Sequence, residues 1–333
     1  MENELITVVI PIFNSSLFLS DCVKSIQNQT YRNLEIILID GGSTDGSRTI
    51  CQELSKKDSR IKLIFEEKNR GQSISRNTGI TIGRGSFFLF IDSDDIAAPT
   101  MIEKMLTNIT LFQADISEVA YRVCENDCPK EAFTSHGKRK FYPDGSYFRI
   151  FLKKALRNKT NSIPVFNKLY RKDVFSKSIF PEKPFSEDFY LNAMLLSKKC
   201  SLVFDTSVQY CYFMRPQSAT HRPLTLNSLF HVTYSYEIYR YCQENHFSRR
   251  ICRLAFDRYL KMLLGVYSKY CCFGGDSPDV EKEMKNSLSL LRKNYWRFLF
   301  SKNRFRFKAA LSLLLCCPKF YAFLMKKIAG GEK

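Results

Sequence analysis

SFFLFIDSDD, residues 86–95, joins a short apolar run to three carboxylates. An apolar run of this length, followed by turn-forming residues, is typical of a strand buried on both faces of a sheet. A single aspartate after a strand is most often a turn former or a helix cap. Asp92, Ser93, Asp94 and Asp95 together, however, make a poor end for a purely structural strand. We therefore expect this strand to end in a polar site.

The first 120 residues repeat this alternation of apolar strands and amphipathic helices. The predicted strands are 5–13, 34–40, 61–65, 86–92 and 115–123. The predicted helices lie around 18–26 and at 44–57, 74–82 and 99–112, with Ser43 or Thr44 as the expected N-cap of the second helix. Strands that alternate with helices favour a parallel or mostly parallel sheet covered by helices on both faces.

The sequence changes character twice after this region. Residues 124–145 are polar and rich in turn formers, which predicts a variable loop. Shorter strand and helix signals mix up to about residue 222, and beyond Pro223 the pattern is nearly all helical. We therefore predict an α/β domain over residues 1–222 and an α-helical region over residues 223–333.

The composition is that of an ordinary globular protein. Of the 333 residues, 44% are hydrophobic and 25% are charged. No stretch reaches the roughly 18 apolar residues that a membrane span needs, and the longest candidate, 309–317, is about half that length. The first residues show neither the basic start nor the apolar core of a secretory signal. We expect a cytoplasmic protein.

The chain has 12 cysteines, scattered or in adjacent pairs. No C-x-x-C pair occurs. Cys124 and Cys128 lie four residues apart, but no second pair of cysteines that could complete a zinc site is found, so a zinc site is not expected. We predict that the cysteines are reduced thiols, in keeping with a reducing compartment.

The net charge of +18 points to an anionic partner such as a nucleic acid, a membrane or an acidic ligand. Most of the excess lies near the C-terminus, where residues 225–333 carry 20 Lys and Arg against 8 Asp and Glu. No acidic residue occurs between Met284 and Gly331.

Polar residues follow three of the predicted strands, at 11–14, 40–46 and 92–95. In an open parallel sheet, ligands bind beyond the carboxyl ends of the strands. Carboxylates gathered there without His or Cys favour a hard cation, Mn²⁺ or Mg²⁺, which usually carries a diphosphate as well. The turn at Gly41 and Gly42 allows close approach to the backbone, yet neither a Walker loop nor a G-x-G-x-x-G loop is present.

These motifs, in this order, resemble family-2 inverting glycosyltransferases of the GT-A fold, of the bacterial cell-surface polysaccharide type. The resemblance covers residues 5–222. The matching stretches are P-x-F-N at 11–14, the D-G-G-S-T-D turn at 40–45, the G-x-S-x-S-R-N-x-G helix at 71–79, D-x-D at 92–95, N-K-L-Y-R at 167–171, the E-D pair at 187–188 and Y-x-x-R-x-x-S-x-T at 212–220. One departure concerns the nucleotide base, because the family often has a second aspartate where this chain has Gly41.

The resemblance implies a GT-A catalytic domain over residues 1–222, with a nucleotide-binding half at 1–120 and an acceptor half at 121–222. It implies Asp188 as the catalytic base, beside Glu187, and a metal held by Asp94 and Asp95 with Asp92 in support. The residues expected to bind the donor are Pro11, Phe13, Asn14, Asp40, Gly41, Arg76, Asp92, Ser93, Asp94, Lys168 and Arg215.

Simpler explanations exist for several of these residues. Glu187 and Asp188 also suit the dipole of a helix start, and Arg76 also suits an ion pair across the sheet. Lys168 also suits a solvated strand. His231 has no partner pattern and is expected to be structural.

The basic C-terminal region interleaves Lys and Arg with aromatic residues, and similar tails occur in relatives that extend lipid-linked glycans. This pattern suits a helix at the surface of an anionic membrane, or an ordinary amphipathic helix packed on the catalytic domain. The partners implied are a nucleotide-sugar donor, probably a UDP-sugar, a glycan or polyprenol-linked acceptor and the inner face of the cytoplasmic membrane. No nucleic acid partner is expected. The competing interpretations are a metal-dependent nucleotidyltransferase and a non-catalytic basic binding module.

Overall fold

A computed structural model describes residues 4–125, 128–157, 163–214, 223–301, 303 and 305–330. The chain divides into two compact units. The sheet unit comprises Met1–Phe148, Asn161–Glu182 and Leu191–Pro216, and the helical unit comprises Arg149–Thr160, Lys183–Tyr190 and Gln217–Lys333. Two segments that precede residue 222 therefore group with the C-terminal helices. The boundary predicted at 222/223 stays a prediction.

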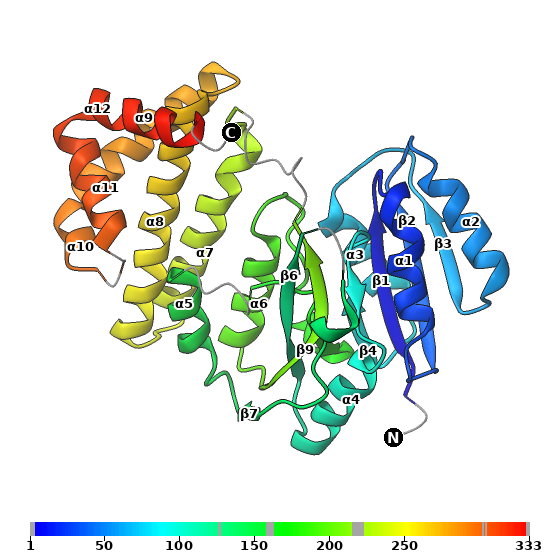
Figure 1. Cartoon of the computed structure of the whole chain (residues 1–333). Coiled ribbons are helices and arrows are strands. Elements are labelled where there is room, and N and C mark those ends of the chain that lie inside the picture. The colour runs from blue at the N-terminus through cyan, green and yellow to red at the C-terminus, as the bar shows by residue number, and fades with distance from the viewer. Residues whose placement is uncertain are drawn as a thin grey trace. The chain divides into compact units, whose positions relative to one another are not determined.

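The sheet unit is built on one nine-stranded sheet in the order β3-β2-β1-β4-β8-β6-β9-β5, with β7 paired to β9 (Figure 1). The strands are β1 (Ile6–Ile12), β2 (Leu34–Asp40), β3 (Ile61–Phe65), β4 (Phe87–Phe90), β5 (Ile96–Ala97), β6 (Ile116–Cys124), β7 (Arg139–Tyr142), β8 (Lys168–Arg171) and β9 (Leu202–Phe213). The helices of this unit are α1 (Ser16–Gln27), α2 (Ser47–Lys57), α3 (Gln72–Ile82) and α4 (Met101–Phe112). The α/β architecture predicted from the sequence, a sheet flanked by helices and followed by an α-helical region, is confirmed.

The first half of the sheet is parallel and the second half is mixed. β1, β2, β3 and β4 pair in parallel, as the alternation of strands and helices predicted. β8 is antiparallel to both β4 and β6, although β6 and β9 are parallel to each other. The sequence offered a strand here only as a solvated alternative for Lys168, because the four residues of β8 are too few to show a clear pattern.

The two faces of β1 bury against different helices. Its residues Ile6, Val8, Ile10 and Ile12 join a core with apolar residues of α1, α2 and α4. The opposite face meets α3 so closely that a Cβ on Gly79 would lie 2.4 Å from a methyl group of Val9. A glycine at this position therefore lets α3 approach the sheet.

The predicted helices agree with the structure within a few residues, but the expected cap of α2 is wrong. The N-cap is Gly46, in a left-handed conformation with φ +94°. Asp45, just before it, accepts hydrogen bonds from the Ser47 amide (3.1 Å), the Ser47 hydroxyl (2.6 Å) and the Ser16 amide (2.9 Å). Asp45 thereby fastens the start of α2 to the start of α1.

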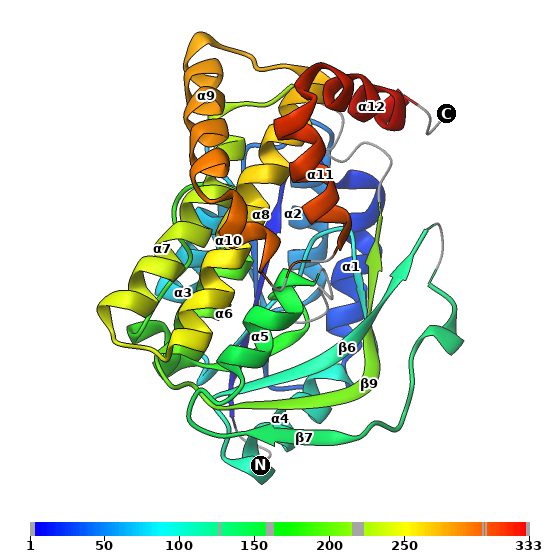
Figure 2. The same ribbon diagram turned by 90° about the vertical axis from the view of Figure 1, so that its left-hand side faces the viewer.

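The helical unit contains α5 (Phe148–Leu156), the start of α6 (Glu187–Ser197), α7 (Phe230–Glu244), α8 (Arg249–Phe273), α9 (Pro278–Lys293), α10 (Tyr295–Leu299), α11 (Phe305–Cys316) and α12 (Pro318–Gly330). The central helix α8 packs against α7, α9, α11 and α12 (Figure 2). Its buried cations tie in α5, because Arg258 and Lys261 donate to the Ala155 and Leu156 carbonyls at 3.1 and 2.8 Å. Cations at the carboxyl end of a helix satisfy its last carbonyls and complement its dipole.

No helix among the described residues combines the length and apolar character needed to cross a membrane. One prediction about the cysteines is corrected. Cys124 and Cys211 form a disulfide between β6 and β9, with their Cα atoms 6.0 Å apart. Sequence spacing gave no sign of this pair because 87 residues separate its members.

Candidate functional site

The turns after β1 and β2 are bonded to each other. Asn14 has a left-handed backbone with φ +50°. Its amide donates to the Ser43 hydroxyl at 2.9 Å, and its side-chain oxygen accepts from the Thr44 amide at 2.9 Å. Phe13 beside it is exposed and Pro11 is half-buried. This polar edge lies at the carboxyl ends of two neighbouring parallel strands, as predicted.

Asp40 closes β2 and is held by the protein itself. Its carboxylate accepts from the Arg48 guanidinium at 2.9 Å and from the Ser43 amide at 3.2 Å. Arg48 also stacks over Phe65, with its guanidinium carbon 4.7 Å from the ring centre. Arg48 was not predicted as a site residue, although its place on the first turn of the helix after Asp40 was a usable signal.

Gly41 follows with an ordinary backbone. Its amide donates to the Ile12 carbonyl at 2.8 Å, and a Cβ built on it would meet no atom closer than 3.5 Å. An aspartate, which the family often carries here, would therefore fit this turn without strain. Its neighbour Gly42 differs, because its φ is +80° and a Cβ would lie 3.0 Å from the Glu67 carbonyl.

Asp92 is paired with a deeply buried cation. Arg76 on α3 is 1% exposed, and its guanidinium lies 2.8 Å from the Asp92 carboxylate and 5.3 Å from the centre of the Phe180 ring. The Asp92 side chain is 27% exposed. The ion pair that the sequence offered for Arg76 is thus present, and its contact with a donor stays a prediction.

Asp95 is fully buried, with 0% of its surface exposed. Its two oxygens accept hydrogen bonds from the Tyr210 hydroxyl and the Phe213 amide, both at 2.8 Å. Burial, together with the nearby charges of Asp92 and Asp94, raises the pKa of Asp95 to about 9. These bonds hold Asp95 against β9, whereas Asp92 and Asp94 are partly exposed. Metal ligation by Asp94 and Asp95 stays a prediction.

The donor set of this loop fits a hard divalent cation. Burial raises the pKa of the Cys22 thiol, and the nearby charges of Asp95, Asp94 and Asp92 raise it further. The charges of Asp92 and Asp94 also raise the pKa of Asp95. A bound cation relieves such repulsion, and oxygen ligands are those that Mn²⁺ and Mg²⁺ prefer. Ser93 fixes the loop to the start of α1, because its hydroxyl is hydrogen-bonded to that of Ser15 at 2.7 Å.

Lys168, predicted to bind the donor, is buried within the sheet, and its contact with a donor stays a prediction. Its side chain on β8 is 1% exposed. The ammonium donates to the Pro164 carbonyl at 2.5 Å and to the Asn167 side chain at 2.9 Å, and it lies 3.7 Å from the Glu118 carboxylate on β6. Lys168 thus pairs a buried acid within the sheet.

Glu187 and Asp188 begin α6 and belong to the helical unit. The two residues before them, Phe185 and Ser186, both have left-handed backbones with φ +71° and +61°. Non-glycine residues rarely adopt this conformation, and such strain is typical of functional segments. Glu187 is buried and Asp188 is half-buried.

His231 on α7 fixes this strained segment. Its Nδ1 atom is hydrogen-bonded to the Ser186 hydroxyl. Burial, aided by the nearby Arg258 and Lys269, lowers the pKa of His231 to about 4, so its ring is neutral at pH 7. The Tyr234 hydroxyl adds a second tie by donating to the Lys183 carbonyl at 2.9 Å. The structural role expected of His231 is thus to hold the segment before Asp188. This contact could not be predicted from the sequence, because 45 residues separate Ser186 from His231.

Arg215, the predicted diphosphate ligand, lies outside the described residues.

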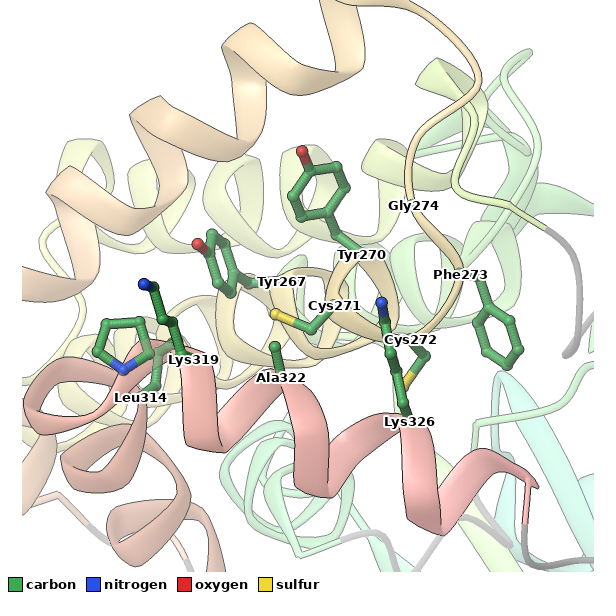
Figure 3. Close-up of a pocket in the computed structure, with 11 residues that line it drawn as sticks. Tyr267, Tyr270, Cys271, Cys272, Phe273, Gly274, Leu314, Lys319, Ala322 and Lys326 are labelled. Atoms are coloured by element: carbon green, nitrogen blue, oxygen red, sulfur yellow. The ribbon is translucent and has the colours of Figure 1, made fainter.

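A pocket of about 630 Å³ opens in the helical unit between α8 and α12 (Figure 3). Tyr267 and Cys271 of α8 face Ala322 of α12 there, with Lys319 and Lys326 at its margin. Its full lining is Tyr267, Tyr270, Cys271, Cys272, Phe273, Gly274, Leu314, Pro318, Lys319, Ala322 and Lys326. It lies in the other unit from the carboxylate loop, and it contains no acidic side chain.

Comparison with known proteins identifies the chain. The sequence profile of glycosyl transferase family 2 matches residues 7–179, more than half of the chain. The chain belongs to this family. The match includes the turns after β1 and β2 and the Asp92–Asp95 loop, so the glycosyltransferase assignment rests on the same residues as the geometry.

Two relatives are bacterial glycosyltransferases. The chain is 33% identical over 230 residues to glycosyltransferase GlyG of Streptococcus pneumoniae serotype 4, covering 65% of this chain and 73% of GlyG. It is 34% identical over 223 residues to glycosyltransferase GlyA of the same organism, covering 66% of this chain. The matched region spans only about a third, 32%, of the length of GlyA.

Two solved structures share the fold of this glycosyltransferase. S. aureus TarS 1–349 in complex with UDP-GlcNAc has a TM-score of 0.66 at 16% identity, covering 98% of this chain and 89% of that one. The mannosyltransferase PcManGT from Pyrobaculum calidifontis, in complex with GDP-Man and Mn²⁺, has a TM-score of 0.51 at 12% identity, covering 98% and 85%. Membership of the family sets aside the nucleotidyltransferase and the non-catalytic module.

Proposed function

We propose that this glycosyltransferase moves a sugar from a UDP-sugar to a hydroxyl group of a lipid-linked or growing cell-surface glycan, with inversion at the anomeric carbon. The observation that carries the proposal is the loop of Asp92, Asp94 and Asp95 at the carboxyl end of β4, beside the bonded turns of Asn14 and Asp40. Uridine is favoured as the base because a UDP-GlcNAc complex is among the structures that share the fold.

Asp94, with Asp92 beside it, is the proposed ligand of Mn²⁺ or Mg²⁺. The cation, when bound, would stabilise the negative charge that develops on the leaving diphosphate. Arg76 holds the Asp92 carboxylate at 2.8 Å and so keeps it at the rim of the loop. Asp95 keeps the loop in place through its bonds to Tyr210 and Phe213. A Mn²⁺ complex of a protein with this fold supports the choice of ion.

Pro11, Phe13, Asn14, Asp40 and Gly41 are the proposed contacts of the nucleoside. Asn14 and Asp40 are held in place by the protein's own hydrogen bonds, so little ordering is needed when the donor binds. The exposed ring of Phe13 offers an apolar surface beside them. Arg215 is the proposed partner of the diphosphate.

Asp188 is the proposed general base, and Glu187 its neighbour at the acceptor. Direct displacement with inversion needs one base to take the proton of the attacking hydroxyl group. Asp188 is half-buried on the first turn of α6, behind a strained segment fixed by His231. A base held in this way loses little freedom when the acceptor arrives.

The C-terminal helices are the proposed contact with an anionic membrane surface, which would place the protein at the inner face of the cytoplasmic membrane. Five large aromatic side chains of this region are strongly exposed: Trp296 (68%), Phe300 (72%), Phe305 (82%), Phe320 (54%) and Phe323 (61%). Exposed aromatic residues among bases, with no acid between residues 284 and 331, match an interface helix on an anionic leaflet.

The membrane proposal is tested by flotation with phosphatidylglycerol vesicles and with phosphatidylcholine vesicles. Wild type is expected to bind the anionic vesicles, less so at high salt, and a Trp296→Ser, Phe300→Ser variant is expected to bind severalfold more weakly. Equal binding to both lipids, or equal binding by both proteins, would refute it.

The enzymatic proposal is tested by nucleoside-diphosphate release from a panel of UDP- and GDP-sugars, with and without Mn²⁺. We expect metal-dependent release from one donor, and its loss in Asp188→Ala when an acceptor is supplied. No turnover of any donor at any metal concentration would overturn the proposal.

A further inference from the structure

Three cysteine sulfurs converge at the ends of two neighbouring strands of the sheet unit. Cys124 closes β6, Cys211 lies on β9, and Cys128 comes four residues after Cys124. The three Sγ atoms all lie within 4.8 Å of one another. The Cys124–Cys211 disulfide uses two of them, and the third sulfur lies against this pair.

The surroundings of the three sulfurs are apolar. Cys124 and Cys211 are buried and Cys128 is half-buried. Ala132 and Phe213 belong to the same buried cluster. An apolar shell excludes water and strengthens the attraction between thiolates and a cation, and the half-buried Cys128 gives an ion a way in.

The arrangement matches what a thiophilic cation requires. Zn²⁺ binds thiolates at about 2.3 Å, so two sulfurs on one tetrahedral ion lie about 3.8 Å apart, within the 4.8 Å observed here. Cys124 and Cys128 are separated by three residues, within the range of two to four that is usual for a pair of zinc ligands.

We propose that reduced Cys124, Cys128 and Cys211 form a thiolate site for a soft divalent cation of the Zn²⁺ type. The Cys124–Cys211 disulfide is the oxidised, metal-free state of the same site. Two thiol groups of an external reductant become a disulfide as Cys124 and Cys211 become thiols. One cation then replaces the three thiol protons, and the fourth position is open to water or another ligand.

This sulfur site differs in chemistry from the carboxylate loop, yet it stands next to it. Cys211 pairs with Ile96 across β5 and β9. Phe213, two residues further, donates its amide to Asp95. An ion that ties β6 to β9 would therefore steady the strand that holds the carboxylate loop.

The test is made on the full chain, reduced with a small dithiol under argon and freed of reductant before metal is added. Co²⁺ is the probe, because thiolate-to-cobalt charge transfer in the near ultraviolet reports sulfur ligands and is silent for carboxylate ligands. Bound zinc is counted by elemental analysis after dialysis against Zn²⁺. Cys128→Ser is compared with Cys252→Ser, which alters a half-buried cysteine of the helical unit.

We expect about one thiolate-bound metal per reduced wild-type chain, loss of at least tenfold in affinity in Cys128→Ser, and no change in Cys252→Ser. The oxidised protein should give no charge-transfer band. Absence of the band in the reduced protein, or an equal band in Cys128→Ser, would overturn the proposal. Circular dichroism of each variant shows whether a lost band reflects lost folding, and a misfolded Cys128→Ser would be replaced by Cys128→Ala.

Discussion

The ion pair between Arg76 and Asp92 should couple the two side chains strongly. Arg76 is 1% exposed and lies 2.8 Å from the carboxylate. A hydrogen bond to a charged group contributes about 1.5–3 kcal/mol, and the contact with Phe180 adds about 1 kcal/mol. We expect Arg76→Met to lower the free energy of unfolding by about 3 kcal/mol, near the low end for a broken buried pair because water reaches Asp92.

A double-mutant cycle with Asp92→Asn isolates the pair from the ring contact. The Asp92→Asn change alone should cost about 1–2 kcal/mol, because it also relieves repulsion with Asp94 and Asp95. The coupling energy should be about 2 kcal/mol. Additive effects, with a coupling below about 0.5 kcal/mol, would refute the view that Arg76 holds Asp92 in place.

The assay must report on the sheet unit and must exclude metal. The single tryptophan, Trp296, lies in the helical unit, so its fluorescence follows the wrong part of the chain. Native-state hydrogen exchange of β1 and β4, measured with a chelator present, gives the free energy of opening for the strands beside the loop. Arg76→Lys serves as a control that keeps the charge but loses the planar fork.

Three further predictions follow from the same geometry. Gly41→Asp should change the free energy of unfolding by less than about 1 kcal/mol in urea denaturation, because a Cβ there meets no atom closer than 3.5 Å, and should strengthen binding of uridine diphosphate in calorimetry. Glu35→Gln should lower the free energy of unfolding by about 1–2 kcal/mol at pH 7. Burial raises the pKa of Glu35, but hydrogen bonds from Lys62, Arg84 and Thr7 outweigh burial and lower that pKa to about 2. The stabilisation is therefore complete above about pH 4.5, and in a pH series of melting temperatures the difference between the two proteins should vanish as the pH falls towards 2. Ser186→Gly should keep the melting temperature, because φ +61° suits glycine, yet lower kcat by roughly ten- to hundredfold with the donor KM unchanged, because the bond to His231 is lost.

Each of these has a result that contradicts it. A folded Gly41→Asp with weaker nucleotide binding would count against a base contact at this turn. A stability difference for Glu35→Gln that persists at pH 2 would show that packing, not charge, dominates at that position. An unchanged kcat in Ser186→Gly would separate the strained segment from catalysis.

The first half of the fold was predictable from sequence because each of its elements carries a local signal. β2 occupies residues 34–40, as its apolar run predicted, and the turns after β1, β2 and β4 meet at one edge because those strands are parallel. The carboxylate loop was predictable for the same reason, because Asp92, Asp94 and Asp95 follow the apolar run of β4 directly in the sequence.

What could not be predicted depends on contacts between distant segments. Lys168 and Glu118 pair only because β8 runs antiparallel to β6, and β8 is too short to be seen in the pattern. Asp95 is buried and Asp94 is partly exposed, although the two are neighbours in sequence. The contact of Cys211 with Cys124 likewise follows from the pairing of β9 with β6.

The central claim is that the Asp94 carboxylate binds a divalent cation and that binding of the nucleotide requires this cation. Calorimetric titration of UDP into the protein with Mn²⁺ and with chelator tests it most directly, in wild type, in Asp94→Asn and in the control Asp173→Asn, whose side chain is 64% exposed and pairs with Arg171. We predict UDP binding that weakens at least tenfold with chelator or in Asp94→Asn and is unchanged in Asp173→Asn. UDP binding of equal strength in Asp94→Asn and wild type, with Mn²⁺ present, would contradict it.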